Sequence, residues 1–117
     1  MFGLFKRQKD EIDFKKENKE QFTALLNEIH EILRDSAYST QANWIKQILS
    51  AVELEDKNLF KERVISANLL GGAGSVVDVW IEDEEKQKRL DDLITSFLGL
   101  TIKSGLNHRA VKSRIKR

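Results

Sequence analysis

Apolar residues recur every three or four positions along most of this chain, and this period is typical of amphipathic helices. In residues 18–35 the apolar side chains follow the i, i+3, i+4, i+7 spacing of one helix face. A second apolar stripe covers residues 44–52, and either Ser39 or Thr40 is expected to cap the helix that carries it. The connection between the two helices, residues 36–39, is short. We therefore expect them to pack antiparallel.

Two further helices are expected beyond these. Asp56 is an acceptable N-cap for a third helix that continues to Leu70, although the β-branched pair at residues 64–65 leaves a strand as an alternative there. Asp83 is expected to cap a last long helix, whose apolar stripe continues through Gly99 to Ile102 and which Gly105 is expected to terminate. The sequence thus predicts a mainly helical chain.

Three of the six glycines lie within residues 71–74, between two strongly apolar runs. Such a cluster permits a positive-φ turn and a close approach of two helices. We expect a helix over residues 76–81, in which Ser75 and Asp78 form a variant of the capping box and Trp80 anchors the core. A strand is the alternative, because these residues are β-branched or aromatic. The residues expected to form this helix–helix joint are Gly71, Gly72, Gly74, Ser75 and Trp80.

A resemblance to a family rests on two segments of the sequence. One is Trp-Ile-x-x-Ile-Leu at residues 44–49, and the other is Leu-Leu-Gly-Gly-Ala-Gly-Ser-Val-Val-Asp-Val-Trp-Ile at residues 69–81. Together with the leucine-rich helix that follows, they resemble a family of small bacterial proteins of unknown function marked by a Gly-Gly-x-Gly-Ser-hydrophobic-x-Asp signature. The resemblance extends loosely over residues 20–102. It implies an all-helical domain and brings no enzymatic activity.

Length and composition agree with one domain. With 117 residues, 40% hydrophobic and 33% charged, and no proline, the sequence predicts an all-α compact bundle of about five helices with the glycine-rich joint at 71–75. Residues 1–17 are expected to be a flexible or frayed N-terminal extension and residues 18–105 the helical domain. Residues 106–117 form a basic tail, too poor in apolar residues to join a core unaided.

Several kinds of chemistry are disfavoured by residues that the sequence lacks. It has no cysteine, and therefore neither disulfides nor thiolate metal sites. The glycine cluster lacks the lysine of a P-loop and the third glycine of a dinucleotide fingerprint. His30 and His108 have no partner at a spacing diagnostic of catalysis or metal binding. We accordingly expect a non-enzymatic protein with no cofactor and no metal.

The expected location is the cytoplasm. No apolar run approaches the roughly 20 residues of a membrane span, and the N-terminus lacks the features of a signal peptide. A membrane foot is a minor alternative, because a short apolar and basic patch begins the chain. Its residues are Phe2, Leu4, Phe5, Lys6 and Arg7.

The distribution of charge suggests what kind of partner the protein binds. Residues 1–102 contain 14 Lys and Arg against 19 Asp and Glu, whereas residues 103–117 contain six Lys and Arg and no acid. An acidic body can attract a basic protein, and the leading hypothesis is an immunity-type protein that sequesters a toxin domain such as a nuclease. The proposed acidic contact residues are Asp78, Glu82, Asp83, Glu84 and Glu85, and more weakly Glu53, Glu55 and Asp56.

The alternative function is a nucleic-acid accessory protein that binds phosphates through its basic tail. An acidic body without a basic helix face or an aromatic stacking platform makes this less favoured. The oligomeric state is left open. The residues that would contact nucleic acid are Arg109, Lys112, Arg114, Lys116 and Arg117.

Overall fold

A computed structural model describes residues 11–115 of the chain, and within that range the fold is all-α, as predicted, with no strand. Among residues 11–115, five helices have seven residues or more, and one four-residue helix and one 3-10 turn complete the set. The order is α1 (Lys16–Asp35), α2 (Ser39–Leu54), α3 (Lys57–Val64), α4 (Ala67–Leu70), the 3-10 turn η2 (Val76–Asp78), α5 (Glu84–Lys103) and α6 (Arg109–Ile115).

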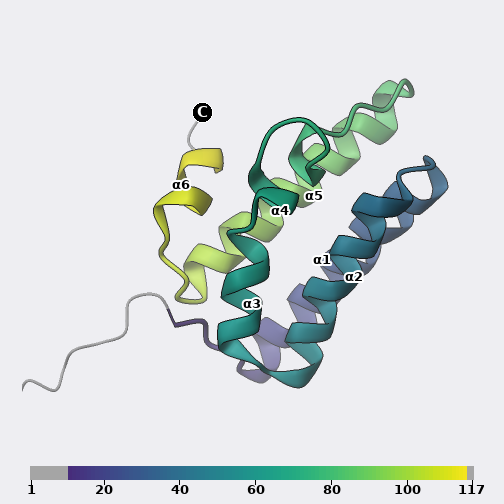
Figure 1. Cartoon of the computed structure of the whole chain (residues 1–117). Coiled ribbons are helices and arrows are strands. Elements are labelled where there is room, and N and C mark those ends of the chain that lie inside the picture. Colours follow the sequence, from purple (N-terminus) through teal and green to yellow (C-terminus); the bar gives the residue numbers. More distant parts are fainter. Residues whose placement is uncertain (1–10, 116–117) are drawn as a thin grey trace, which may run out of the picture.

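The three long helices form the body of the molecule (Figure 1). Helix α1 packs antiparallel to α2, as the short connection predicts, and also packs against α5. Helix α3 and the short α4 pack against α2, while α6 packs against α5 and α4. In the part of the chain that the structure describes, no helix is long and apolar enough to cross a bilayer.

Edge-to-face contacts between phenylalanine rings join segments that are far apart in the sequence. The ring of Phe60 in α3 lies 5.3 Å from that of Phe14, 5.2 Å from that of Phe22 and 6.3 Å from that of Phe97. Such contacts add to the free energy of burying the rings. One aromatic cluster therefore connects the segment before α1 with α1, α3 and α5.

Two of the expected N-caps are confirmed. The carboxylate of Asp56 accepts a hydrogen bond from the N–H of Leu59, and that of Asp83 accepts from the N–H groups of Glu85 and Lys86. The expected Ser39 or Thr40 cap is wrong, because the cap position of α2 is Tyr38 and its side chain makes no capping bond. The expected third helix is interrupted after Val64, and α4 restarts from Ser66, whose hydroxyl caps it.

The expected helix over residues 76–81 is also wrong. After the turn η2 the chain is extended, so that Val79 and Ile81 are buried while Trp80, between them, is 67% exposed. Side chains of an extended chain alternate in direction, and this alternation buries the two β-branched residues together. Trp80 therefore does not anchor the core.

Both ends of the described chain contribute to the core, contrary to expectation. In the part of the N-terminal extension that the structure describes, Ile12 and Phe14 are buried, and the N–H of Asp13 donates to the carbonyl of Ser104 at 2.8 Å. In the basic tail, Leu106 and Val111 are fully buried. These two apolar side chains attach the tail to the core, because the tail packs against α5 and α4, whose buried residues belong to the same apolar cluster.

Candidate functional site

The proposed acidic contact residues are all exposed, but the fold separates them into two groups. Glu53, Glu55 and Asp56 lie where α2 meets α3, together with the exposed Leu54, and we name this the Leu54 end. Asp78 and residues 82–85 lie before and at the start of α5, at the opposite end of the body (Figure 1), and with Trp80 they form the Trp80 end. The two groups therefore do not form one acidic surface.

Two of the three carboxylates of the Leu54 end already have partners. That of Glu55 lies 2.7 Å from the ammonium of Lys19, and that of Asp56 caps α3. Leu54 itself is 67% exposed, the same fraction as Trp80. With these carboxylates engaged, the Leu54 end offers a partner less unpaired negative charge.

The backbone of Trp80 is held firmly although its side chain is exposed. The hydroxyl of Tyr38, in the turn between α1 and α2, donates to the carbonyl of Trp80 at 2.5 Å. On either side of Trp80, the amide of Gln87 in α5 accepts from the N–H of Ile81 at 2.6 Å and donates to the carbonyl of Val79 at 3.4 Å. These bonds satisfy backbone groups that a neighbouring strand would otherwise bind.

The other tryptophan shows what a structural indole does in this fold. Trp44 is half-buried, and its Nε1 donates to the carbonyl of Arg63 at 3.2 Å. The indole of Trp80 makes no hydrogen bond within residues 11–115. The Trp80 side chain is thus presented to solvent on a backbone that is fixed.

Carboxylates lie close to Trp80 in the sequence, and two of them, Glu82 and Glu84, line the same hollow as Trp80. Asp83 is used as the cap of α5, but within the described residues Asp78, Glu82, Glu84 and Glu85 take part in no ion pair. A hollow of about 330 Å³ lies beside the indole, and its lining includes Glu82, Glu84 and Asp91. The Trp80 end therefore combines an exposed apolar group with unpaired negative charge.

Further acidic residues, which sequence reasoning missed, extend this surface towards α1. A second hollow of about 310 Å³ separates Glu31 and Asp35 of α1 from Glu85 of α5. The pair of Arg89 with Glu28, 2.5 Å apart, crosses between the same two helices. Only the packing of α1 on α5 brings these carboxylates near Glu85, because some 50 residues separate them in the sequence.

The predicted glycine-rich joint is a turn within the loop between α4 and α5, and each of its residues has a different role. A Cβ at Gly71 would lie 2.6 Å from the carbonyl oxygen of Ala67, and Gly74 has a φ of +88°. Gly72 has open space around it. The Ser75 hydroxyl does not cap η2 but donates to the carbonyl of Gly71 at 2.6 Å, and Asp78 ends that turn instead of starting a helix.

The loop lies over the beginning of α2. There the side-chain amide of Gln41 donates to the carbonyl of Gly74 at 2.9 Å. Tyr38, three residues earlier, binds the carbonyl of Trp80. The turn is therefore attached to the same part of α2 as the segment that carries Trp80.

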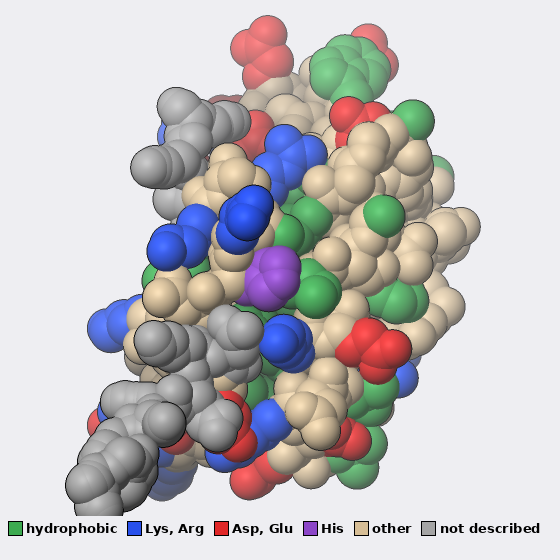
Figure 2. Space-filling model, turned by 60° about the vertical axis from the view of Figure 1, so that its left-hand side comes forward, with side chains coloured by type: hydrophobic (Ala, Val, Ile, Leu, Met, Phe, Trp, Pro, Cys, Tyr) green, Lys and Arg blue, Asp and Glu red, His purple; other side chains and the backbone are tan. Residues whose placement is uncertain are grey.

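The basic residues of the tail are partly on a folded helix. Arg109, Lys112 and Arg114 are exposed on α6, whereas Lys116 and Arg117 lie outside the described residues. Lys and Arg side chains gather across the middle of the face in Figure 2, and Asp and Glu lie mainly towards its upper and lower ends. The positive region thus lies between the two acidic ends.

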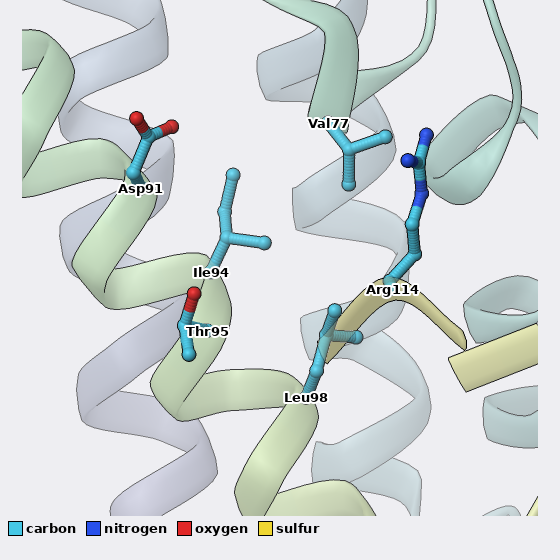
Figure 3. A pocket seen from close by; sticks show the side chains of 6 residues that line it. All are labelled: Val77, Asp91, Ile94, Thr95, Leu98 and Arg114. Carbon is cyan, nitrogen blue, oxygen red and sulfur yellow. The ribbon is translucent and has the colours of Figure 1, made fainter. Parts of the chain in front are cut away.

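Arg114 also lines a groove of about 230 Å³ between the η2 loop, α5 and α6 (Figure 3). Val77, Ile94 and Leu98 provide its apolar surface, and Asp91 lies on the wall across from Arg114. The guanidinium donates to the carbonyl of Leu70 at 3.1 Å, which ties α6 to the end of α4. Arg114 is therefore already part of the tertiary structure.

The titratable groups offer little for catalysis. Within residues 11–115, no three His, Asp or Glu side chains are placed to hold a metal ion. Burial lowers the pKa of His30, and the positive charges of Lys46 and Arg34 lower it further, against a small opposing effect of Glu31. The pKa of His30 is therefore held below its ordinary value, mainly by burial, which favours the neutral imidazole near pH 7.

Comparison of the chain with protein-family models, with curated proteins and with solved structures gave no match.

Proposed function

We propose that this chain is a non-enzymatic protein-binding module that recognises its partner with the Trp80 end. In its most concrete form, the proposal is an immunity-type protein that acts in the cytoplasm and neutralises a bacterial toxin domain. No cofactor is required for such a function. The partner would carry a positively charged surface, as nuclease domains do.

The observation that carries the proposal is an exposed indole on a fixed backbone. Trp80 is 67% exposed, while Tyr38 and Gln87 hold the backbone at and on either side of it. Tryptophan is enriched among the residues that dominate binding energy, because it buries a large apolar area. A backbone that is already ordered loses little conformational entropy on association.

The unpaired negative charges also favour the Trp80 end as the binding surface. Glu82 and Glu84 line the hollow beside the indole, and Asp78 and Glu85 lie close to Trp80 in the sequence. All four take part in no ion pair within the described residues, so their negative charge is available to a partner. Complementary charge speeds diffusional encounter and orients the partner. Trp80 would then provide most of the affinity, and the carboxylates of the Trp80 end would raise the association rate and provide specificity.

A photo-crosslinking amino acid at position 80 tests the proposal, and the same substitution at Leu54 is a matched control. The two side chains are equally exposed. Leu54 is the last residue of α2, and Trp80 belongs to the segment that leads into α5, which begins at the opposite end of the body. Crosslinking in the native cell should yield one partner from position 80 and not from position 54. The purified partner should bind the unmodified protein, and Trp80→Ala should weaken that complex by about 2 kcal/mol or more.

The same partner then permits a test of neutralisation. Its toxic activity should be inhibited by the wild-type protein and restored when Glu82, Glu84 and Glu85 are changed to lysine. Asp83 is left unchanged because it caps α5. Equal crosslinking from positions 80 and 54 would contradict the proposal. So would inhibition of the toxin that is unchanged both by Trp80→Ala and by the three glutamate-to-lysine changes.

Nucleic-acid binding through α6 is the second candidate. It is favoured by one observation: Arg109 and Lys112 are exposed on a folded helix that contains no acidic residue. Removing the tail is a poor test, because Leu106 and Val111 belong to the core. Arg109→Gln with Lys112→Gln should abolish salt-sensitive RNA binding if this function is correct, and an absence of binding by the wild type would exclude it.

A further inference from the structure

The hollow beside Trp80 suggests which partner group the Trp80 end recognises. Trp80 and Ile81 form its apolar part, and Glu82, Glu84 and Asp91 its acidic part. Gln87 and Lys88 complete the lining. Its volume of about 330 Å³ is enough for one long side chain of a partner and lies at the lower end of the range of about 300–1,000 Å³ that ligand sites occupy.

The charges in this hollow are unbalanced. Lys88 provides the one cation in the lining, and its ammonium lies 3.2 Å from the carboxylate of Asp92, outside the hollow. Asp91 accepts a hydrogen bond from Gln87, which is neutral, at 3.1 Å. The net charge of the lining is therefore negative.

The indole adds a second kind of attraction. A guanidinium group can stack on an indole face, and it also matches the planar geometry of carboxylates with its fixed set of N–H donors. Lysine has the charge but neither the planarity nor the fork of donors. An exposed tryptophan beside three carboxylates thus favours arginine.

We propose that the hollow between Trp80 and the first turns of α5 receives an arginine side chain of the partner. The guanidinium stacks on the Trp80 indole and forms charge-assisted hydrogen bonds with Glu82 and Glu84. This rests on the proposed function and specifies its chemistry. Gln87 acts as a positioning residue, because its bonds to Ile81 and Val79 fix the segment that presents the indole.

Nuclear magnetic resonance of the two indole N–H groups provides the test. The probe is a capped peptide of alternating glycine and arginine. The control is the same peptide with citrulline in place of arginine, because citrulline has nearly the same shape as arginine but no charge. The arginine peptide should shift the Trp80 signal and leave that of Trp44, which is bonded to Arg63, in place. Raising the salt concentration should weaken the effect.

Two matched double variants check the carboxylates. Glu82→Gln with Glu84→Gln should weaken peptide binding roughly three- to tenfold, as expected for the loss of two exposed charges beside an indole. Glu53→Gln with Glu62→Gln removes two exposed charges elsewhere and should leave binding unchanged. Equal shifts with the citrulline peptide, or equal loss in both variants, would overturn the inference.

The outcomes separate this inference from the proposed function. A partner crosslinked at position 80, with no response of the Trp80 signal to the arginine peptide, rejects the arginine hollow and keeps the binding function. A specific response to the peptide without a crosslinked partner supports the hollow and rejects the function.

Discussion

Gln87 and Ile81 are joined by a 2.6 Å hydrogen bond, in which the side-chain oxygen of Gln87 accepts from the backbone N–H of Ile81. The bond connects α5 to the extended segment that precedes it. The segment has no neighbouring strand within residues 11–115, and the side chain of Gln87 takes the place of one. The position of Trp80 therefore depends on a side chain seven residues away.

Replacing Gln87 with methionine should lower the free energy of unfolding by about 1–3 kcal/mol, because it leaves partly buried backbone groups of Val79 and Ile81 without partners. Chemical denaturation measures this loss. Lys88→Met, which changes an exposed neighbour to the same side chain, is the control and should cost no more than about 0.5 kcal/mol. Equal stabilities of the two variants would show that the hydrogen bonds of the Gln87 side chain contribute nothing to the free energy of unfolding.

Gly71→Ala and Gly72→Ala should differ although the two glycines are adjacent. A Cβ at Gly71 would meet the carbonyl of Ala67 at 2.6 Å, whereas at Gly72 it meets nothing within 4 Å. We expect Gly71→Ala to destabilise by about 1–3 kcal/mol and Gly72→Ala to change stability by less than about 0.5 kcal/mol. Thermal unfolding of both variants checks the order, and a larger effect at position 72 would contradict it.

Val111→Ala should destabilise the whole domain, because Val111 is fully buried where α6 packs on the core. Loss of two buried methyl groups predicts about 1–3 kcal/mol, seen as a fall in melting temperature. Lys112→Ala, at the exposed neighbouring position, is the control. A Val111→Ala protein with wild-type stability would mean that the tail is not part of the cooperative core.

Stability should fall in mildly acidic solution because of His30. Its pKa is lowered in the folded state from the ordinary value of 6.5, so the unfolded chain binds the proton more tightly. The full stability is present above the unfolded pKa and decreases as the pH falls through 6.5 towards the lowered folded pKa, below which this contribution stays constant. Urea unfolding between pH 5 and 8 measures the slope.

Two variants identify the groups responsible for that slope. His30→Gln should remove it, and Lys46→Gln should reduce it because Lys46 is one of the cations that oppose protonation of His30. An unchanged slope in His30→Gln would assign the pH dependence to other groups.

Local sequence signals are sufficient to predict the three long helices and two of the helix caps. The apolar period predicted α1, α2 and α5, and Asp56 and Asp83 were recognisable as caps, because these signals depend on neighbours within four residues. The glycines of residues 71–74 likewise indicate a turn, because glycine adopts positive φ readily whatever its neighbours, as Gly74 does here.

Contacts between distant segments set the conformation of residues 79–81 and the position of Trp80. Their pattern suits either a helix or an extended chain, and bonds from Tyr38 and Gln87 select the extended form. Packing likewise separated the acidic residues into two ends and buried Leu106 and Val111 of the basic tail. Each of these depends on contacts between segments distant in the chain, which no local pattern of residues encodes.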